Sequence, residues 1–343
     1  MATMTSARRI VLLALASRAV MLTLMVLSDA LFVDLDSSAR LQNRPCDSVC
    51  GRADRTPEDA MACDSDATWS SAVDELAPWD TVFFVRIARC GYETDMINAF
   101  FPLLPGAMRV GAALLSPLLG SALPPESLAV LAALALNAAA FCLAAWALHR
   151  LTLGVLAGDE WAAAAAVLFF CANPASVFYS AAYTEALFAA AFWTGLLQLH
   201  RQRLWAGAVC LAAASTGRSN GILNVWFVLH PWLRQAVVSR RLDGGWRVGA
   251  ACALILAPYA LMQWHAWLSF CSSSALSFPP PAWCARAVPS VYADVQRRYW
   301  DVGFLRFYRK LVRWPRVAQS LPVAALSFAG CWTWVRHDPA RAL

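Results

Sequence analysis

The sequence predicts an all-α protein whose helices cross a membrane several times, and three observations carry that prediction. Of its 343 residues, 59% are hydrophobic and only 15% are charged, whereas soluble domains are about a quarter charged. Apolar runs of about 20 residues, the length that spans a bilayer, recur along the chain. Sixteen tryptophans suit a protein with two membrane–water interfaces. We therefore expect one membrane domain over residues 1–343, and no nucleic-acid partner, because the arginines form no basic arm.

Eight apolar segments are expected to span the membrane as a helical bundle. The first follows Arg8 and Arg9, and its apolar run is longer than the roughly 7–15 residues of a signal peptide. We therefore favour a retained first helix over a cleaved signal peptide. The fifth and sixth segments are short, and "STGRSNG" at 215–221 separates them. The expected spans lie near residues 10–32, 126–149, 160–179, 183–200, 204–218, 220–233, 247–268 and 317–335.

Arginine placement sets the orientation of these spans. With a cytoplasmic N-terminus, basic residues follow spans two, four, six and eight on the inner side, as the positive-inside rule requires. The apolar stretch 100–120 would reverse that pattern if it crossed, and three prolines interrupt it. We expect it to be an interfacial or re-entrant segment. Two long loops with interfacial helices then face the outer side, at about 33–125 and 269–316.

The eleven cysteines divide by depth. Five are expected to be plain apolar residues within the spans: Cys142, Cys171, Cys210, Cys252 and Cys331. Six lie in or beside the long loops, where an oxidising compartment would let them pair in an order that spacing does not fix: Cys46, Cys50, Cys63, Cys90, Cys271 and Cys284. No histidine accompanies the Cys46-x3-Cys50 pair, so we predict no zinc site there.

Asp80 is the first candidate for chemistry. It opens "WDTVFFVRIARCGY", in which Trp79, Phe83 and Ile87 recur at helical spacing, as in an amphipathic helix lying in the membrane surface. One interpretation makes Asp80 an ordinary helix-capping acid that complements the helix dipole. The other makes it a base held at the level of the lipid headgroups.

Further polar residues are expected on the same membrane face as Asp80. Tyr183 and Glu185 open the fourth span, and "STGRSNG" supplies Arg218 and Asn220. Glu185 could simply complement a helix dipole, and Arg218 could simply snorkel to the interface. However, glycines beside an arginine leave room for a phosphate, whose oxygens suit a guanidinium. Arg18, inside the first span, is either paired within the bundle or reaching for a headgroup.

These residues suit group transfer from a lipid-phosphate donor, because they combine a base, a phosphate-holding arginine and amides beside the apolar "NAFFPLLPG". Two D-x-D sequences, at 34–36 and 64–66, could hold a metal, but such pairs are common by chance. We assign no metal ligand, and a need for a divalent metal stays open.

The sequence resembles the GPI mannosyltransferase 2 (PIG-V) family. The matching stretches run in family order from about residue 14 to 324, among them "WDTVFFVRIARCGY", "NAFFPLLPGAMRV", "NPASVFYSAAYTEALFA", "TGRSNG" and "PAWCARAVPSVYADVQRRYWDVGFLRFYRK". The resemblance implies a GT-C type glycosyltransferase of the endoplasmic reticulum membrane with a luminal active site. It implies transfer of the second mannose, α1,6-linked and with inversion, from dolichyl-phosphate mannose to the GPI-anchor precursor. No other cofactor is implied, and a small membrane partner subunit is expected because some family members work with one.

The resemblance also distributes roles among residues. Inversion needs one base, and the family's "WD" falls on Trp79 and Asp80, so Asp80 is the expected catalytic base. The family's "RSNG" begins at Arg218, which we infer to contact the donor phosphate. The expected substrate-binding residues are Trp79, Arg218, Asn220, Glu185, Tyr183 and Asn98.

The chain also departs from the family pattern. Family members usually continue with further hydrophobic helices beyond the eighth span, and residues 40–75 look like an insertion. Thr184 replaces a serine, and Asp301 stands where asparagine is common, so we do not assign it to catalysis. These departures keep a non-catalytic scaffold subunit among the alternatives. The others are a different dolichyl-phosphate-sugar-dependent glycosyltransferase and a transporter of lipid or small anionic solutes, although no internal repeat of the transporter kind is evident.

Overall fold

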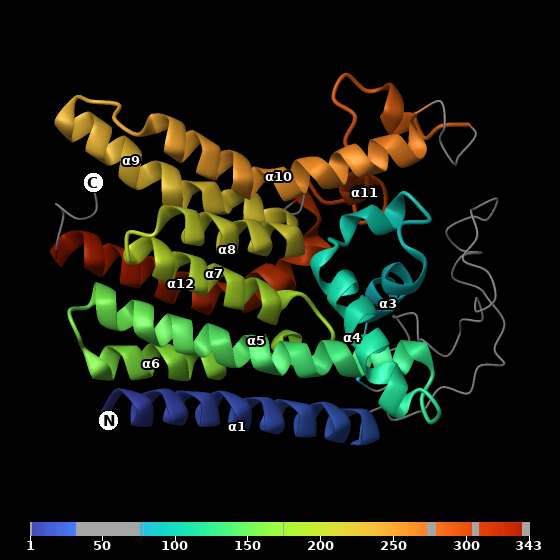
Figure 1. Ribbon diagram of the computed structural model, residues 1–343, viewed down its shortest axis with the longest axis horizontal. Coiled ribbons are helices and arrows are strands. Elements are labelled where there is room, and N and C mark those ends of the chain that lie inside the picture. Colours follow the sequence, from blue (N-terminus) through green and yellow to red (C-terminus); the bar gives the residue numbers. More distant parts are fainter. Residues whose placement is uncertain are drawn as a thin grey trace.

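The computed structural model describes residues 2–31, 76–77, 79–173, 175–272, 279–303 and 309–337. Among these residues all regular secondary structure is helical, which confirms the all-α prediction. The long helices run lengthwise (Figure 1), and α1, α5, α7, α8 and α10 pack in that order, with α6 against α5 and α9 against α10. Their bounds are α1 Ala2–Leu31, α5 Pro125–Val155, α6 Glu160–Cys171, α7 Glu185–His200, α8 Leu204–Gly217, α9 Trp226–Ser239, α10 Gly245–Phe270 and α12 Trp314–His337.

Small residues let these helices approach closely. Alanines of α5 and α7 form one core with Phe141 and Phe170. Between α7 and α8, a Cβ on Gly207 would lie 2.5 Å from the side chain of Leu199 and 3.2 Å from the carbonyl oxygen of Gly195. Such contacts are typical of membrane bundles, where association depends on close packing and not on a hydrophobic drive between helices.

Each of the eight expected spans contains a helix, but the span 160–179 is an α-helix only as far as Cys171, and the helices differ in length. Among the residues that the structure describes, three helices are long and apolar enough to cross a membrane: residues Ala7–Ser28 of α1, Pro125–Val155 and Gly245–Phe270. Helices α6, α7, α8 and α9 have 12, 16, 14 and 14 residues, fewer than the roughly 20 that a crossing needs. Helix α12 has 24 residues but is not among the three.

The prolines of the stretch 100–120 do not interrupt it as predicted, whereas its interfacial or re-entrant placement stays a prediction. The stretch forms a continuous helix, α4 (Leu103–Leu119), and is not interrupted by its prolines. Pro102 is the N-cap residue and Pro105 lies in the first turn, where backbone N–H groups have no partner within the helix. Only Pro117, near the end, removes an internal hydrogen bond.

Helix α3 (Thr81–Cys90) confirms the expected helix but not its expected exposure. Its buried face includes Val82, Phe84 and Val85, which pack with residues of α4 and α5. Phe83 of the predicted stripe is only partly buried, and Trp79 is exposed. The helix therefore buries its apolar face against protein instead of leaving that face open to a membrane surface.

Both long loops contribute helices to one end of the bundle (Figure 1). The first loop supplies α3, α4 and the 3₁₀ turn η2 (Met96–Ala99), and the second supplies α11 (Val291–Arg298), η5 (Ala282–Ala285) and η7 (Leu311–Arg313). A disulfide between Cys271 and Cys284 ties the second loop to the end of α10, and Cys90 is also disulfide-bonded. The five cysteines expected within spans are free. Cys46, Cys50, Cys63 and both D-x-D sequences lie outside the described residues.

Candidate functional site

A cavity of about 450 Å³ opens at the end of the bundle where the two loops meet. Its walls come from the start of α3, the turn before α7, the junction of α8 with the 3₁₀ helix η4 (Ser219–Val225), and the second loop. Of the seven residues predicted for the site, the cavity is lined by Asp80, Tyr183, Glu185 and Arg218. These four come from three segments that are far apart in the sequence.

Asp80 occupies the N-cap position of α3 without capping the helix. Its side chain makes no cap hydrogen bond, and its backbone is already helical, with φ −68° and ψ −11°. By contrast, the N-cap side chains of Asp159 and Ser290 accept hydrogen bonds from Ala162 and Ala293 in the usual way. The carboxylate of Asp80 is therefore directed to the cavity and not used by its helix.

The charge on Asp80 is disfavoured by its surroundings. Burial raises the pKa of Asp80 above the usual aspartate value, the negative charge of Glu185 raises it further, and the positive charge of Arg218 lowers it. A carboxylate with a raised pKa is a stronger base than an exposed aspartate. This property suits a group that must accept a proton from a substrate hydroxyl.

Tyr183 holds Asp80 in position through the backbone. The N–H of Asp80 donates to the phenolic oxygen of Tyr183 at 2.9 Å. Tyr183 belongs to the turn before α7, and Asn137 of α5 holds that turn. The Asn137 amide donates to the carbonyl oxygen of Ala181 at 2.6 Å and to that of Tyr183 at 2.9 Å. Sequence reasoning missed Asn137, although a polar residue in the middle of an apolar span is the signal that could have found it.

Glu185 and Arg218 form an ion pair at the cavity wall. Arg218 also donates to the hydroxyl of Thr184 at 3.3 Å. The other carboxylate oxygen of Glu185 is buried and has no hydrogen-bond partner among the described residues. A buried acceptor without a partner is costly.

The turn after Arg218 depends on glycine. A Cβ on Gly221 would lie 2.4 Å from the Cα and 2.8 Å from the backbone nitrogen of Ser215, so η4 can fold back on α8 only without a side chain at that position. The hydroxyl of Ser219 donates to the Tyr292 oxygen at 2.6 Å and joins η4 to α11. Asn220 is exposed and does not line the cavity.

Asn98 and Trp79, also predicted to bind substrate, do not line the cavity either. Asn98 is fully buried, and its amide donates to the carbonyl oxygens of Thr94 at 2.8 Å and Asp95 at 3.4 Å. It therefore stabilises its own turn instead of lining the cavity. Trp79 is 47% exposed, has a positive φ of 49°, and packs its ring against Phe178 at 5.6 Å. It shapes the entry to α3 but does not line the cavity.

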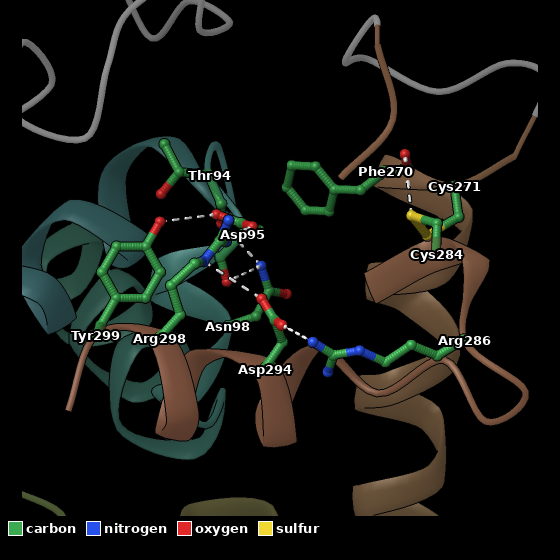
Figure 2. Close-up of polar contacts among 10 residues, drawn as sticks. All are labelled: Thr94, Asp95, Asn98, Phe270, Cys271, Cys284, Arg286, Asp294, Arg298 and Tyr299. Atoms are coloured by element: carbon green, nitrogen blue, oxygen red, sulfur yellow. Dashed lines mark hydrogen bonds and ion pairs between the residues drawn. A yellow bond between two sulfur atoms is a disulfide. The ribbon is translucent and has the colours of Figure 1, made fainter. Parts of the chain in front are cut away.

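A network of ion pairs docks α11 onto the first loop (Figure 2). Arg298 pairs with Asp95 of the first loop and, at 3.3 Å, with Asp294 one turn earlier. Asp294, which is buried, also pairs with Arg286 at 2.5 Å, and the hydroxyl of Tyr299 lies 3.5 Å from Asp95. These contacts, beside the disulfide, fix α11 across the cavity.

The docked second loop adds cavity residues that the sequence did not single out. Tyr292, Gln296, Trp300 and Arg313 line the wall. The pattern of aromatic and basic residues in their loop does not say which ones face inward. Asp301, which was not assigned to catalysis, pairs with Lys310 at 2.5 Å and with Arg313 at 3.4 Å. No group of three or more potential metal ligands occurs among the described residues.

We expect the network around Arg298 to set the stability of the second loop. Arg298→Gln removes the cation between Asp95 and Asp294, so the free energy of unfolding should fall by about 1–3 kcal/mol, the value of hydrogen bonds to charged groups. Thermal unfolding in detergent would measure this change. Arg297→Gln removes an equal charge from the neighbouring exposed position and should have little effect. Equal effects of the two variants would mean that the network contributes no stability.

The chain is similar to known proteins along nearly its whole length. A family model described as mannosyltransferase (PIG-V) matches residues 7–343. The GPI alpha-1,6-mannosyltransferase 2 of Cricetulus griseus is 36% identical over 310 residues, covering 82% of this chain and 62% of that protein. The enzyme of the same name from Rattus norvegicus is 38% identical over 291 residues, covering 77% and 58%. The GPI mannosyltransferase 2 of Schizosaccharomyces pombe is 30% identical over 240 residues, covering 67% and 48%.

The chain thus spans less than two thirds of the length of these curated relatives. No solved structure matches it.

Proposed function

Because the chain belongs to the PIG-V mannosyltransferase family, we propose that it transfers the second mannose, in α1,6 linkage, to a GPI-anchor precursor. The proposed donor is dolichyl-phosphate mannose, and the reaction inverts the anomeric configuration. The observation that carries the proposal is the meeting of Asp80, Glu185 and Arg218 in one cavity at the loop end of an apolar helical bundle. The names of the relatives support the sugar and the linkage.

In the proposed mechanism Asp80 acts as the general base. The acceptor hydroxyl oxygen bonds to the anomeric carbon of the donor mannose while its proton passes to a carboxylate oxygen of Asp80. The bond between that carbon and the phosphate oxygen breaks, and the lipid phosphate leaves with the electron pair. A single displacement of this kind inverts the anomeric centre.

Arg218 is the proposed contact for the leaving phosphate. A guanidinium can bind phosphate oxygens through two parallel hydrogen bonds and stabilise the charge that develops on them. Because Arg218 is already paired with Glu185, the phosphate would share the arginine or displace the carboxylate. If the phosphate displaces Glu185 from Arg218, the released carboxylate would accept a hydrogen bond from a sugar hydroxyl.

The membrane arrangement of this enzyme is also a proposal. We propose a GT-C type bundle of about eight spans in the endoplasmic reticulum membrane, with both long loops and the cavity on the luminal side. The positive-inside pattern supports this orientation, and so does the gathering of α3, α4 and α11 at one end of the bundle (Figure 1). A small membrane partner subunit remains part of the proposal.

Transfer of labelled mannose tests the proposal. The chain would be expressed in membranes that lack second-mannose activity, with the GPI precursor and dolichyl-phosphate mannose supplied. A dimannosyl product with an α1,6 linkage would support the function. A product on another acceptor would favour the alternative glycosyltransferase, and no product from a folded chain with its partner present would contradict the proposal. Repeating the assay with a chelator tests for a divalent metal.

The pH dependence of transfer should report on Asp80. Because the base must be ionised, kcat/KM should fall as pH drops through the raised pKa of Asp80. Glu185→Gln removes the negative charge that raises this pKa, so the acid limb of the pH profile should move to lower pH. Arg218→Gln removes the positive charge that lowers it, so the limb should move to higher pH, with a lower rate.

The measurement is a pH–rate profile for each variant at equal amounts of folded protein. Glu160→Gln changes an exposed acid in the first turn of α6 and should leave the limb in place. If the acid limb of the pH–rate profile shifts in the same direction for Glu185→Gln and Arg218→Gln, a group other than Asp80 sets that limb.

A further inference from the structure

Arg18 lies in α1, away from the cavity wall, and its side chain is almost completely buried, at 3% exposure. One guanidinium nitrogen donates to the carbonyl oxygen of Ser176 at 2.7 Å and to the hydroxyl of Ser180 at 2.8 Å. The other donates to the Ser17 hydroxyl at 2.9 Å and to the Ser176 hydroxyl. The flat face of the guanidinium lies 3.9 Å from the centre of the Phe141 ring. Of the two interpretations of Arg18 from sequence, pairing within the bundle is therefore confirmed.

The partners of Arg18 are unusual for a buried cation. All of its hydrogen-bond acceptors among the described residues are uncharged oxygens, and its Nε has no partner there. Burying a cation without a carboxylate is costly. A leucine or methionine would fill this position at lower cost if packing alone were needed. The arginine must therefore contribute something that its directed hydrogen bonds supply.

Those bonds hold a break between two helices. Helix α6 ends at Cys171 and α7 begins at Glu185, and of the described residues between them only those of the short 3₁₀ turn η3 (Ser176–Tyr179) are regular. Carbonyl groups in such a break have no helical partners and need donors from elsewhere. Arg18 supplies several donors in a planar fork, and Ser17 adds one to the carbonyl oxygen of Cys171 at 2.9 Å. Lysine could not reproduce this fork.

The same break carries the cavity residues. The carbonyl groups that Asn137 holds follow directly after Ser180. The phenolic oxygen of Tyr183 accepts a hydrogen bond from the N–H of Asp80. Glu185, two residues later, pairs with Arg218. The break is thus fixed by Arg18 at its start and by Asn137 near its end. Any shift of residues 176–180 would be transmitted to the two groups that position and tune Asp80.

We propose that Arg18 is a positioning residue for the cavity. It holds residues 176–184 in the conformation that places Tyr183 against Asp80 and Glu185 against Arg218. It touches no substrate and acts only through this segment. The structural part of the proposal stands by itself, and its kinetic consequence rests on the proposed function.

Arg18→Lys tests the proposal, because it retains the charge but loses the fork. Amide hydrogen exchange at residues 176–184 should accelerate at least tenfold, while exchange in α5 and α10 stays unchanged. Turnover should fall by about 10- to 100-fold, as expected when reacting groups shift by up to about 1 Å, with KM values for both substrates changed much less. Arg109→Lys, at an exposed position of α4, is the matched control and should change none of these values.

A double-mutant cycle separates positioning from general stability. If Arg18 acts through Tyr183, then Arg18→Lys combined with Tyr183→Phe should lower kcat by clearly less than the product of the two single effects. If Arg18→Lys fails to fold, Ser180→Ala removes one acceptor of the fork and should give the same local exchange pattern with a smaller effect.

Two results would overturn the proposal. One is exchange at residues 176–184 that stays at the native rate or rises equally throughout the bundle. The other is an unchanged kcat per folded molecule. If the native chain itself transfers no mannose, the proposed function fails, and the exchange experiment still decides whether Arg18 holds the segment.

Discussion

Asp80→Asn is expected to reduce mannose transfer by about 10²- to 10⁴-fold, the usual contribution of a general base. Asparagine has nearly the same shape as aspartate but cannot take the proton from the acceptor hydroxyl. Because the Asp80 backbone N–H, and not its side chain, bonds to Tyr183, the variant should retain the fold of the cavity. The measurement is the initial rate of labelled mannose transfer at equal amounts of folded protein.

The same variant should be more stable than the native chain near neutral pH. The pKa of Asp80 in the folded protein is raised above its ordinary value, so the ionised carboxylate destabilises the folded state at any pH above both values. This destabilisation disappears as pH falls and the group becomes protonated. Replacing the carboxylate with an uncharged amide should therefore raise the melting temperature at neutral pH and have less effect in acid.

Asp159→Asn is the matched control for Asp80→Asn. Asp159 is exposed and accepts a hydrogen bond as the N-cap of α6, and asparagine caps helices about as well as aspartate. Transfer by this variant should stay near the native rate. Native rates with both variants would remove Asp80 from the mechanism while leaving the enzymatic function in place.

Gly221→Ala is expected to have the second largest effect. The added Cβ would lie 2.4 Å from the Cα of Ser215, and backbone atoms of α8 cannot rotate away as a side chain could. The 3₁₀ helix after Arg218 would have to move, at a cost of about 1–3 kcal/mol in the free energy of unfolding. Because Arg218 lies between α8 and this turn, transfer should fall at least tenfold, as expected of a shift of up to about 1 Å at the site.

Gly249→Ala provides the opposite case. Nothing lies within 4 Å of a Cβ added at Gly249 in α10. In a helix, alanine is more favourable than glycine by about 1 kcal/mol of free energy. This variant should be as stable as the native chain or slightly more stable, with unchanged transfer. Thermal unfolding and transfer rates measure both variants. Similar stability and activity in Gly221→Ala and Gly249→Ala would show that the close contact at Ser215 is not needed.

Much of the site could be predicted from sequence because its residues lie at helix ends. Asp80, Glu185 and Arg218 each stand where an apolar run begins or stops, and charged groups at such positions are drawn to a common membrane face. Asn98 and Asn220 were assigned on motif position alone. The structure places neither in the cavity, since Asn98 bonds to its own turn and Asn220 points to the exterior.

The amino-acid sequence by itself determined that the chain is helical and apolar, which segments form most of its helices, and which family it resembles. The first two properties follow from local composition and periodicity, which each segment carries alone, and the resemblance follows from short motifs in a fixed order. Only the tertiary structure decided that Glu185 pairs with Arg218, that Asn137 and Arg18 hold the segment bearing Tyr183, and that α11 closes the cavity. Each of these contacts joins residues from distant segments, and no local pattern specifies which side chains meet once the helices have packed.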